Sequence, residues 1–369
     1  MARRRWLAPW KDSLEKPSIY HLISRVVDRR MAFGPGEKER FRTLMRMTED
    51  FTGCRVLSYC LMSNHFHILL EVPPRPIEPI PDTELFRRLA IFYPPWKVAE
   101  QRQLLNLARE SGNIAETQRL LESHTYRMHD LSEFMKILLQ RFTTWFNRRT
   151  QRSGRLWEQR FKSVLVESGF AAQTVAAYID LNPVRAGLCE DPIDYRWSSY
   201  AEAAAQGHKA RSGLVRIMEQ LTAKSSRYAN PTSWQSDPAE LDRQAREWSH
   251  AGLASRYRLF LLGKSTRVER DGRVVRKGMN REKARNEIDQ IQPTPGTRHL
   301  AVSEVIRSRV RHFTDGAVIG GKAFVEEAFD GSRSYFGHRR QSGARKPKGS
   351  LAGLSGEIWT ARDLRKDVD

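Results

Sequence analysis

The sequence predicts an α+β fold in which helices pack on one face of an antiparallel sheet. Apolar strands and amphipathic helices alternate over the first 200 residues in the order β-α-β-β-α-β-α. The second and third strands are joined only by Ser63 and Asn64, which predicts a hairpin and therefore antiparallel pairing. Hydrophobic residues make up 40% of the chain, enough to build a core.

The first half of the pattern contains three strands and one helix. Residues 18–27 predict the first strand. Residues 37–51 follow a Gly-Pro-Gly turn and place their apolar residues on one helical face. The short apolar runs at 56–62 and 65–72 are interpreted as the two arms of the hairpin.

The second half begins after an insertion, which we place at about 73–130. Its first ten residues contain five prolines, which predict a stiff extended linker, and the rest is polar and helical in pattern. The elements expected after it are an amphipathic helix at 131–148, a strand at 161–167 and a helix from 170 to about 181, stopped by Pro183.

The chain divides into four regions by composition. They are a basic arm at 1–17, the folded unit at 18–200, an Ala-, Gly-, Ser- and Lys-rich linker at 201–233, and a mostly helical basic extension at 234–369. Within the extension, two predicted helices at 304–313 and 322–329 flank a glycine-containing turn. A DNA-binding helix-turn-helix and plain helical packing both fit that pattern.

The formal net charge of +20 indicates a polyanionic partner, most simply a nucleic acid, although a soluble basic surface is the plainer alternative. The balance is +8 over residues 1–200 and +12 over 201–369. No apolar run approaches the ~20 residues of a membrane span, so a membrane partner is not expected.

Three cysteines, Cys54, Cys60 and Cys189, form no CxxC pair and predict neither a disulfide framework nor a structural zinc site. The basic N-terminus lacks the apolar stretch of a secretory signal. We therefore expect a cytoplasmic, nucleoid-associated protein.

His65 and His67 begin the second arm of the hairpin. On a strand, residues i and i+2 point to the same face, so the two imidazoles should project together while Phe66 faces the core. Paired imidazoles are common metal ligands. Two polar residues on a wetted sheet face are the alternative interpretation.

Tyr178 and Asn182 lie four residues apart on the last predicted helix, hence on one helical face, with Asp180 roughly opposite. A tyrosine hydroxyl can attack a phosphodiester, but its ordinary pKa of ~10 requires a metal to stabilise the developing charge. The Asn182 amide oxygen could complete such a metal site, although Pro183 disfavours helical backbone at Asn182. A buried tyrosine with a hydrogen-bonded hydroxyl is the alternative.

These motifs together resemble the single-tyrosine HUH transposases of the IS200-like superfamily, and most closely the REP-associated tyrosine transposases. His-Phe-His on a hairpin strand precedes Tyr-x-x-x-Asn-Pro-Val-Arg-Ala-Gly-Leu on a helix. Further matching segments are Asn147-Arg-Arg, Gly154-Arg-Leu-Trp157, Arg160-Phe-Lys-Ser-Val-Leu-Val-Glu167 and Asp194-Tyr-Arg-Trp-Ser-Ser-Tyr200. The resemblance covers about residues 15–202, and the insertion and the long C-terminal extension depart from it.

The resemblance implies a ferredoxin-like HUH nuclease domain. The family's divalent metal, Mg or Mn, would be bound by His65, His67 and Asn182, and its nucleophile corresponds to Tyr178. The implied activity is cleavage and rejoining of single-stranded DNA through a covalent 5′-phosphotyrosine, at hairpin-forming repeats, with a homodimer as a candidate assembly. The alternatives are a domesticated, non-catalytic DNA-binding regulator and a metal-dependent hydrolase that uses water.

Basic residues interleaved with aromatic ones support binding to single-stranded DNA, in which cations contact phosphates and rings stack on bases. The candidates are Arg148, Arg149, Arg155, Arg160, Lys162 and Arg185. The neighbouring aromatics Phe142, Trp145 and Phe146 are expected to be largely core. Residues 338–349 hold five Lys or Arg and no acid, which fits a phosphate-binding tail or a solvated linker equally.

Overall fold

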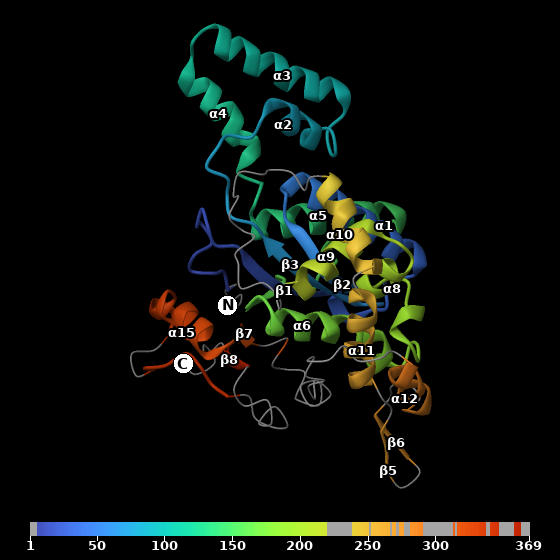
Figure 1. Ribbon diagram of the computed structural model, residues 1–369. Helices are drawn as coiled ribbons and strands as arrows, with labels where there is room; N and C mark the ends of the chain where they lie inside the picture. Colours follow the sequence, from blue (N-terminus) through green and yellow to red (C-terminus); the bar gives the residue numbers. More distant parts are fainter. Residues whose placement is uncertain are drawn as a thin grey trace.

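The computed structural model shows a central sheet with helices on both sides (Figure 1). The residues that it describes are 6–219, 238–250, 252–265, 268–270, 273–276, 281–290, 313, 316–336, 340–346 and 358–362.

Six elements form the first part of the architecture. They are β1 (Ser18–Arg25), α1 (Pro35–Thr52), β2 (Arg55–Leu61), β3 (His65–Val72), α5 (Leu131–Arg149) and β4 (Lys162–Val166). β1 pairs antiparallel with β3 and β4, and β3 with β2, so the strand order is β2-β3-β1-β4. Each helix thus connects two parallel strands separated by an antiparallel one, the split βαβ arrangement of ferredoxin-like folds. The predicted α+β fold class is confirmed.

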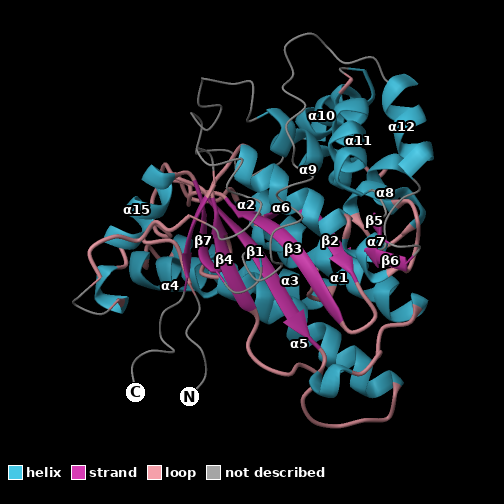
Figure 2. Ribbon diagram, turned by 90° about the horizontal axis from the view of Figure 1, so that it is seen from below, coloured by secondary structure: helices cyan, strands magenta, loops and turns pink. Residues whose placement is uncertain are grey.

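The C-terminal extension contributes two more strands to the same sheet. β7 (Gly316–Gly320) pairs parallel with β4, and β8 (Trp359–Arg362) pairs antiparallel with β7. Figure 2 shows β7 beside β4 at this side of the sheet. The prediction of a glycine-containing turn before residue 322 is therefore wrong over residues 316–320. These small residues form a strand that pairs with β4 on one side and with β8 on the other. The following helix, α15 (Lys322–Asp330), matches the prediction for 322–329, whereas 304–312 lies outside the described residues.

Helices cover both faces of the sheet, not one face as the sequence predicted. α1 and α5 pack on one face, around Phe41, Phe66 and Phe142. The other face is covered by α6 (Phe170–Asp180), α8 (Ser199–Ala204), α9 (His208–Glu219) and α11 (Leu253–Ser265). The reason lies in β1 and β3, whose successive residues are almost all buried, so both sides of these strands require a cover.

The prediction of a linker at 201–233 is also wrong over its first part. The helices α8 and α9 occupy most of residues 199–219. α9 packs directly against β2. A Cβ at Gly213 would lie 2.7 Å from the carbonyl oxygens of Val56 and Leu57, so glycine permits this close approach. The small-residue composition thus reflects tight helix–strand packing there; residues 220–233 lie outside the described part.

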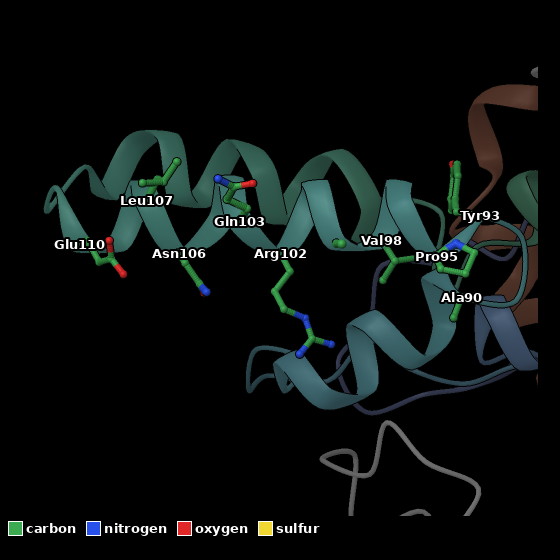
Figure 3. Close-up of a pocket in the computed structure, with 10 residues that line it drawn as sticks. Ala90, Tyr93, Pro95, Val98, Arg102, Gln103, Asn106, Leu107 and Glu110 are labelled. Atoms are coloured by element: carbon green, nitrogen blue, oxygen red, sulfur yellow. The ribbon is translucent and has the colours of Figure 1, made fainter.

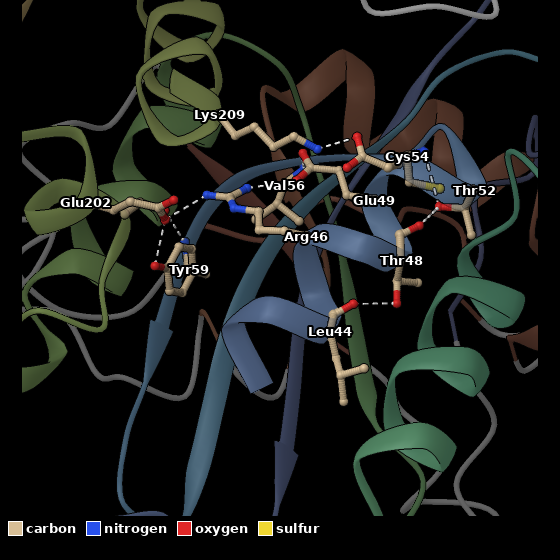
Figure 4. A network of polar contacts seen from close by, with 12 residues as sticks. Leu44, Arg46, Thr48, Glu49, Thr52, Cys54, Val56, Tyr59, Glu202 and Lys209 are labelled. Atoms are coloured by element: carbon tan, nitrogen blue, oxygen red, sulfur yellow. Dashed lines mark hydrogen bonds and ion pairs between the residues drawn. The ribbon is translucent and has the colours of Figure 1, made fainter. Parts of the chain in front are cut away.

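A polar network closes the outer edge of β2 (Figure 4). Glu202 of α8 accepts hydrogen bonds from Arg46 of α1 (2.8 Å) and from the Tyr59 hydroxyl of β2 (2.7 Å). Arg46 also donates to Glu49 (2.8 Å), whose second oxygen accepts from the Val56 amide (2.7 Å). Because α1 and α8 lie on opposite faces, these contacts join the two layers around an edge strand that would otherwise be open.

The insertion is helical, as predicted, and projects from one end of the molecule (Figure 1). It consists of α2 (Asp82–Leu89), α3 (Pro95–Glu110) and α4 (Ile114–Thr125). These helices share a small core that reaches the main body through Phe51 of α1. The pair Glu84–Arg88, 2.6 Å apart, is almost fully buried there.

Other described segments are the N-terminal residues before β1 and the elements between α9 and β7. Trp6, from the expected N-terminal arm, is buried against Phe336, with ring centroids 5.1 Å apart. The extension begins with α10 (Pro238–His250) and α11, and the short elements that follow are β5 (Val268–Arg270), β6 (Arg273–Arg276) and α12 (Arg281–Gln290). Among the described helices, none has both the length and the apolar composition of a bilayer span.

Candidate functional site

The two predicted histidines lie together on one face of β3. Their ring centroids are 5.2 Å apart with perpendicular planes, and His67 is only 3% exposed. His65 is paired in register with Arg25, and His67 with Ile23. The strand period of two therefore brings both imidazoles to the face that α6 covers, as the sequence predicted.

Tyr178 reaches the histidines from α6. Its ring centroid lies 5.6 Å from that of His67, with the planes perpendicular, and its side chain is 2% exposed. Asn182 begins the short helix α7 (Asn182–Ala186), after a break that Pro183 accounts for. The Asn182 Nδ2 donates to the Tyr178 carbonyl oxygen (3.0 Å), so the one-turn relation between the two residues survives the break.

A third histidine, His21 of β1, belongs to this cluster and was missed by the sequence analysis. Its Nε2 lies 3.0 Å from Nδ1 of His67, and its Nδ1 lies 2.8 Å from the carbonyl oxygen of Phe313. The Phe313 ring stacks on Tyr178 with centroids 4.9 Å apart. Strand alternation puts His21 and Arg25 on one face, but only the pairing of β1 with β3 shows that they face His67 and His65.

Three cations border the cluster. The Arg185 guanidinium lies 5.2 Å from the centroid of the Tyr178 ring. Ile23 is paired with both His67 and Lys162, so the exposed Lys162 side chain is on the same sheet face as the histidines. Arg25, which the sequence analysis did not select, lies opposite His65.

The other predicted DNA-binding residues are exposed and make no contact with the histidines among the hydrogen bonds and ion pairs of the described residues. They are Arg148, Arg149, Arg155 and Arg160. Their segment lies near the same end of the sheet, because Val26 bridges to Trp157 and the Glu158 amide donates to the Arg25 carbonyl oxygen. Arg149 is engaged with Glu37 at 3.3 Å. Of the aromatics, Phe142 and Phe146 are core, as expected.

Burial dominates the electrostatics of the cluster. It raises the pKa of Tyr178 to about 12, against the opposing effects of Arg185 and of a hydrogen bond with Asn182. It lowers the pKa of His65 to about 4 and that of His21 to about 4. The pKa of His67 falls well below its ordinary value through burial and the neighbouring histidines. All three imidazoles are therefore neutral at pH 7, the form that binds metals.

The donor set of the cluster fits a divalent cation. The Nδ1 atoms of both histidines are engaged, His65 with Asn64 Oδ1 (2.7 Å) and His67 with His21, which leaves the two Nε2 atoms as ligands. The third donor expected from the sequence is the amide oxygen of Asn182, whose amide nitrogen donates to the Tyr178 carbonyl oxygen. Within the described ranges no group of three or more His, Cys, Asp or Glu could hold a metal, so a third ligand would have to be an amide, a backbone group, water or DNA.

A groove on the insertion is separate from this cluster. It has a volume of about 630 Å³ and lies along α3, with Tyr93, Val98 and Arg102 among its lining residues (Figure 3). It contains no histidine or cysteine, and α3 lies far from α6 in Figure 1. The groove therefore offers none of the chemistry found at the histidine cluster.

Comparisons with known proteins agree with the motifs. Residues 16–77 match the family model described as "Transposase IS200 like". This segment contains His21, His65 and His67, and the resemblance predicted from the sequence is confirmed over it. A solved structure of a REP-associated tyrosine transposase bound to a REP hairpin is similar at 12% identity and a TM-score of 0.34, covering 56% of this chain and 86% of that one. No curated protein matches.

Proposed function

We propose that this chain is a metal-dependent single-stranded DNA endonuclease and strand transferase of the IS200-like transposase type, with Tyr178 as its nucleophile. The observation that carries the proposal is the 5.6 Å separation of the Tyr178 and His67 rings, from residues 111 positions apart in the chain. A DNA-binding regulator without catalysis needs no such cluster. The match of residues 16–77 to a transposase family supports the same conclusion.

In this proposal, His65, His67 and Asn182 would hold the cation, Mg or Mn, which would supply charge stabilisation at the scissile phosphate. The Tyr178 oxygen attacks the phosphorus, the bond to the 3′ oxygen breaks, and the departing strand gains a 3′-hydroxyl. The 5′ end stays on Tyr178 as a phosphotyrosine. Another 3′-hydroxyl can reverse the step without ATP, because the ester bond is conserved.

The residues around Tyr178 prepare it for this reaction. Its buried hydroxyl must lose a proton, and Arg185 beside the ring favours the phenolate. Because Tyr178 is 2% exposed, binding of the strand must also open the cover over this side chain. Lys162 and the exposed arginines at the same end of the sheet would contact the phosphates of the strand.

The DNA substrate in this proposal is a single strand next to a hairpin. The REP-associated tyrosine transposase of the similar solved structure is itself bound to a REP hairpin. A single-stranded flank is required by the chemistry, because the phosphate has to enter a site between β3 and α6. A homodimer and a role of 234–369 in DNA binding remain predictions.

The test is a denaturing gel after incubation with end-labelled hairpin DNA and Mn²⁺. The wild type should give a protein–DNA adduct, and Tyr178→Phe should give none while it still binds the hairpin. Tyr126→Phe, at an exposed tyrosine of the insertion, is the matched control and should form the adduct normally. Full adduct yield from Tyr178→Phe, or a free 5′-phosphate without an adduct, would reject the proposal.

A further inference from the structure

The hydrogen-bond chain from Phe313 through His21 to His67 has only one consistent arrangement of protons. A carbonyl oxygen can only accept, so Nδ1 of His21 must carry its hydrogen toward Phe313. In a neutral ring the Nε2 of His21 is then an acceptor, and Nδ1 of His67 must donate to it across 3.0 Å. A neutral His67 is left with a bare lone pair on Nε2.

We propose that His21 is a positioning residue, which fixes His67 in the tautomer with a free Nε2 by relaying the hydrogen-bond direction set by the Phe313 carbonyl. The inference rests on the proposed function, since it assigns the freed nitrogen to the cation. Without His21, either ring nitrogen of His67 could carry the hydrogen, and the tautomer with Nε2–H cannot ligate through that atom. Outer partners of this kind commonly change metal affinity 10–100-fold.

The C-terminal extension thereby becomes part of the site. Phe313 precedes β7, which is held on β4 by the pairs Leu165–Val318 and Val166–Ile319. The Gly321 amide further donates to Glu167 Oε2 at 2.5 Å. These contacts anchor the main chain that presents the carbonyl. The carbonyl belongs to the main chain and the ring to the side chain, so truncation of the Phe313 ring leaves the acceptor for His21 in place.

Two substitutions of His21 separate its hydrogen bonding from its bulk. Glutamine can donate from its amide nitrogen to the Phe313 carbonyl and accept from His67 with its amide oxygen, so His21→Gln preserves the relay. Phenylalanine keeps an aromatic ring but neither hydrogen bond, so His21→Phe breaks it. Phe313→Ala removes the ring that covers Tyr178 but keeps the carbonyl, and serves as the control.

The first measurement is the tautomer of His67 in the metal-free full-length protein, by long-range ¹⁵N–¹H correlation with histidine labelling. The signal is assigned by its loss in His67→Gln. The wild type, His21→Gln and Phe313→Ala should show hydrogen on Nδ1 only, whereas His21→Phe should show both tautomers. A wild-type His67 with hydrogen on Nε2, or a single unchanged tautomer in His21→Phe, would overturn the proposal.

The second measurement is Mn²⁺ affinity, from the electron paramagnetic resonance signal of the free ion. His21→Phe should bind Mn²⁺ about 10–100-fold more weakly, while His21→Gln should stay within about threefold of the wild type. Equal losses in both variants would indicate a packing role and reject the relay. If the wild type shows hydrogen on Nδ1 of His67 only but forms no DNA adduct, the proposed function fails and the relay through His21 stands. If the wild type forms the adduct but shows both tautomers of His67, the relay fails and the proposed function stands.

Discussion

Replacing Asp180 by asparagine should remove a loss of stability that the wild type shows as the pH rises from 5 to 8. Asp180 is fully buried, and its Oδ1 accepts from the Tyr200 amide (3.1 Å) while its Oδ2 accepts from the Tyr257 hydroxyl (2.6 Å). It lies two residues from Tyr178, hence on nearly the opposite side of α6, and ties this helix to α8 and α11. Burial raises the pKa of Asp180 to about 7, and hydrogen bonds with Tyr257, Tyr200 and Ser58 only partly oppose this effect.

The sign of the effect follows from proton binding. Between the unfolded pKa of 3.8 and the folded pKa of about 7, the native state holds a proton that the unfolded chain has released. The stability that this proton provides is therefore lost as the pH rises toward 7 and stays lost above it. Between pH 5 and pH 8, the folded and unfolded states differ in proton binding over about two pH units, up to the folded pKa. At 1.36 kcal/mol per unit, the free energy of unfolding of the wild type falls by about 3 kcal/mol over this interval. Asparagine has no proton to lose.

Urea unfolding followed by tryptophan fluorescence at pH 5 and pH 8 measures this difference. The stability of Asp180→Asn relative to the wild type should increase by about 3 kcal/mol over this interval, because other titrating groups cancel in the comparison. Asp12→Asn, at an exposed carboxylate, should show no such change. A relative stability that is independent of pH, or one that falls as the pH rises, would refute the reasoning.

Three further predictions concern the nucleophile, the cation and the packing of α9. With the hairpin at saturating concentration, Arg185→Met should slow adduct formation about tenfold, since losing one favourable charge shifts the Tyr178 pKa upward by about one unit; an unchanged rate in single-turnover gels would exclude this role. EDTA should abolish the adduct and excess Mn²⁺ should restore it, whereas persistence of the adduct in EDTA would contradict metal dependence. Gly213→Ala should destabilise the protein by about 1–3 kcal/mol, because the added methyl meets the Leu57 carbonyl. Gly36→Ala, whose added methyl would meet only the Arg149 side chain at 4.0 Å, should stay near the wild type in the same urea experiment.

The parts of the site that follow local periodicity could be predicted from the sequence. The i, i+2 spacing on a strand brings His65 and His67 together, and the i, i+4 spacing keeps Asn182 beside Tyr178 despite Pro183. The order of strands and helices was sufficient for the α+β class. These relations depend on the geometry of single elements or of adjacent ones.

What the sequence could not provide depends on contacts between distant segments. His21 faces His67 only because β1 lies between β3 and β4, and Phe313 reaches both through a parallel strand added from the C-terminal region. The glycines at 316 and 320 predict a turn, because glycine is common in turns. Pairing with β4 on one side and β8 on the other makes these residues a strand. Tertiary contacts decided both cases.

The folded unit that supports the histidine cluster therefore extends beyond residues 18–200. In a fragment that ended there, β4 would lose its pairing with β7 and become an exposed sheet edge. His21 would lose the carbonyl that sets its tautomer, and the Tyr178 ring would lose the stacked Phe313. Part of the C-terminal region is thus structural support for the histidine cluster, whatever its +12 charge contributes to DNA binding.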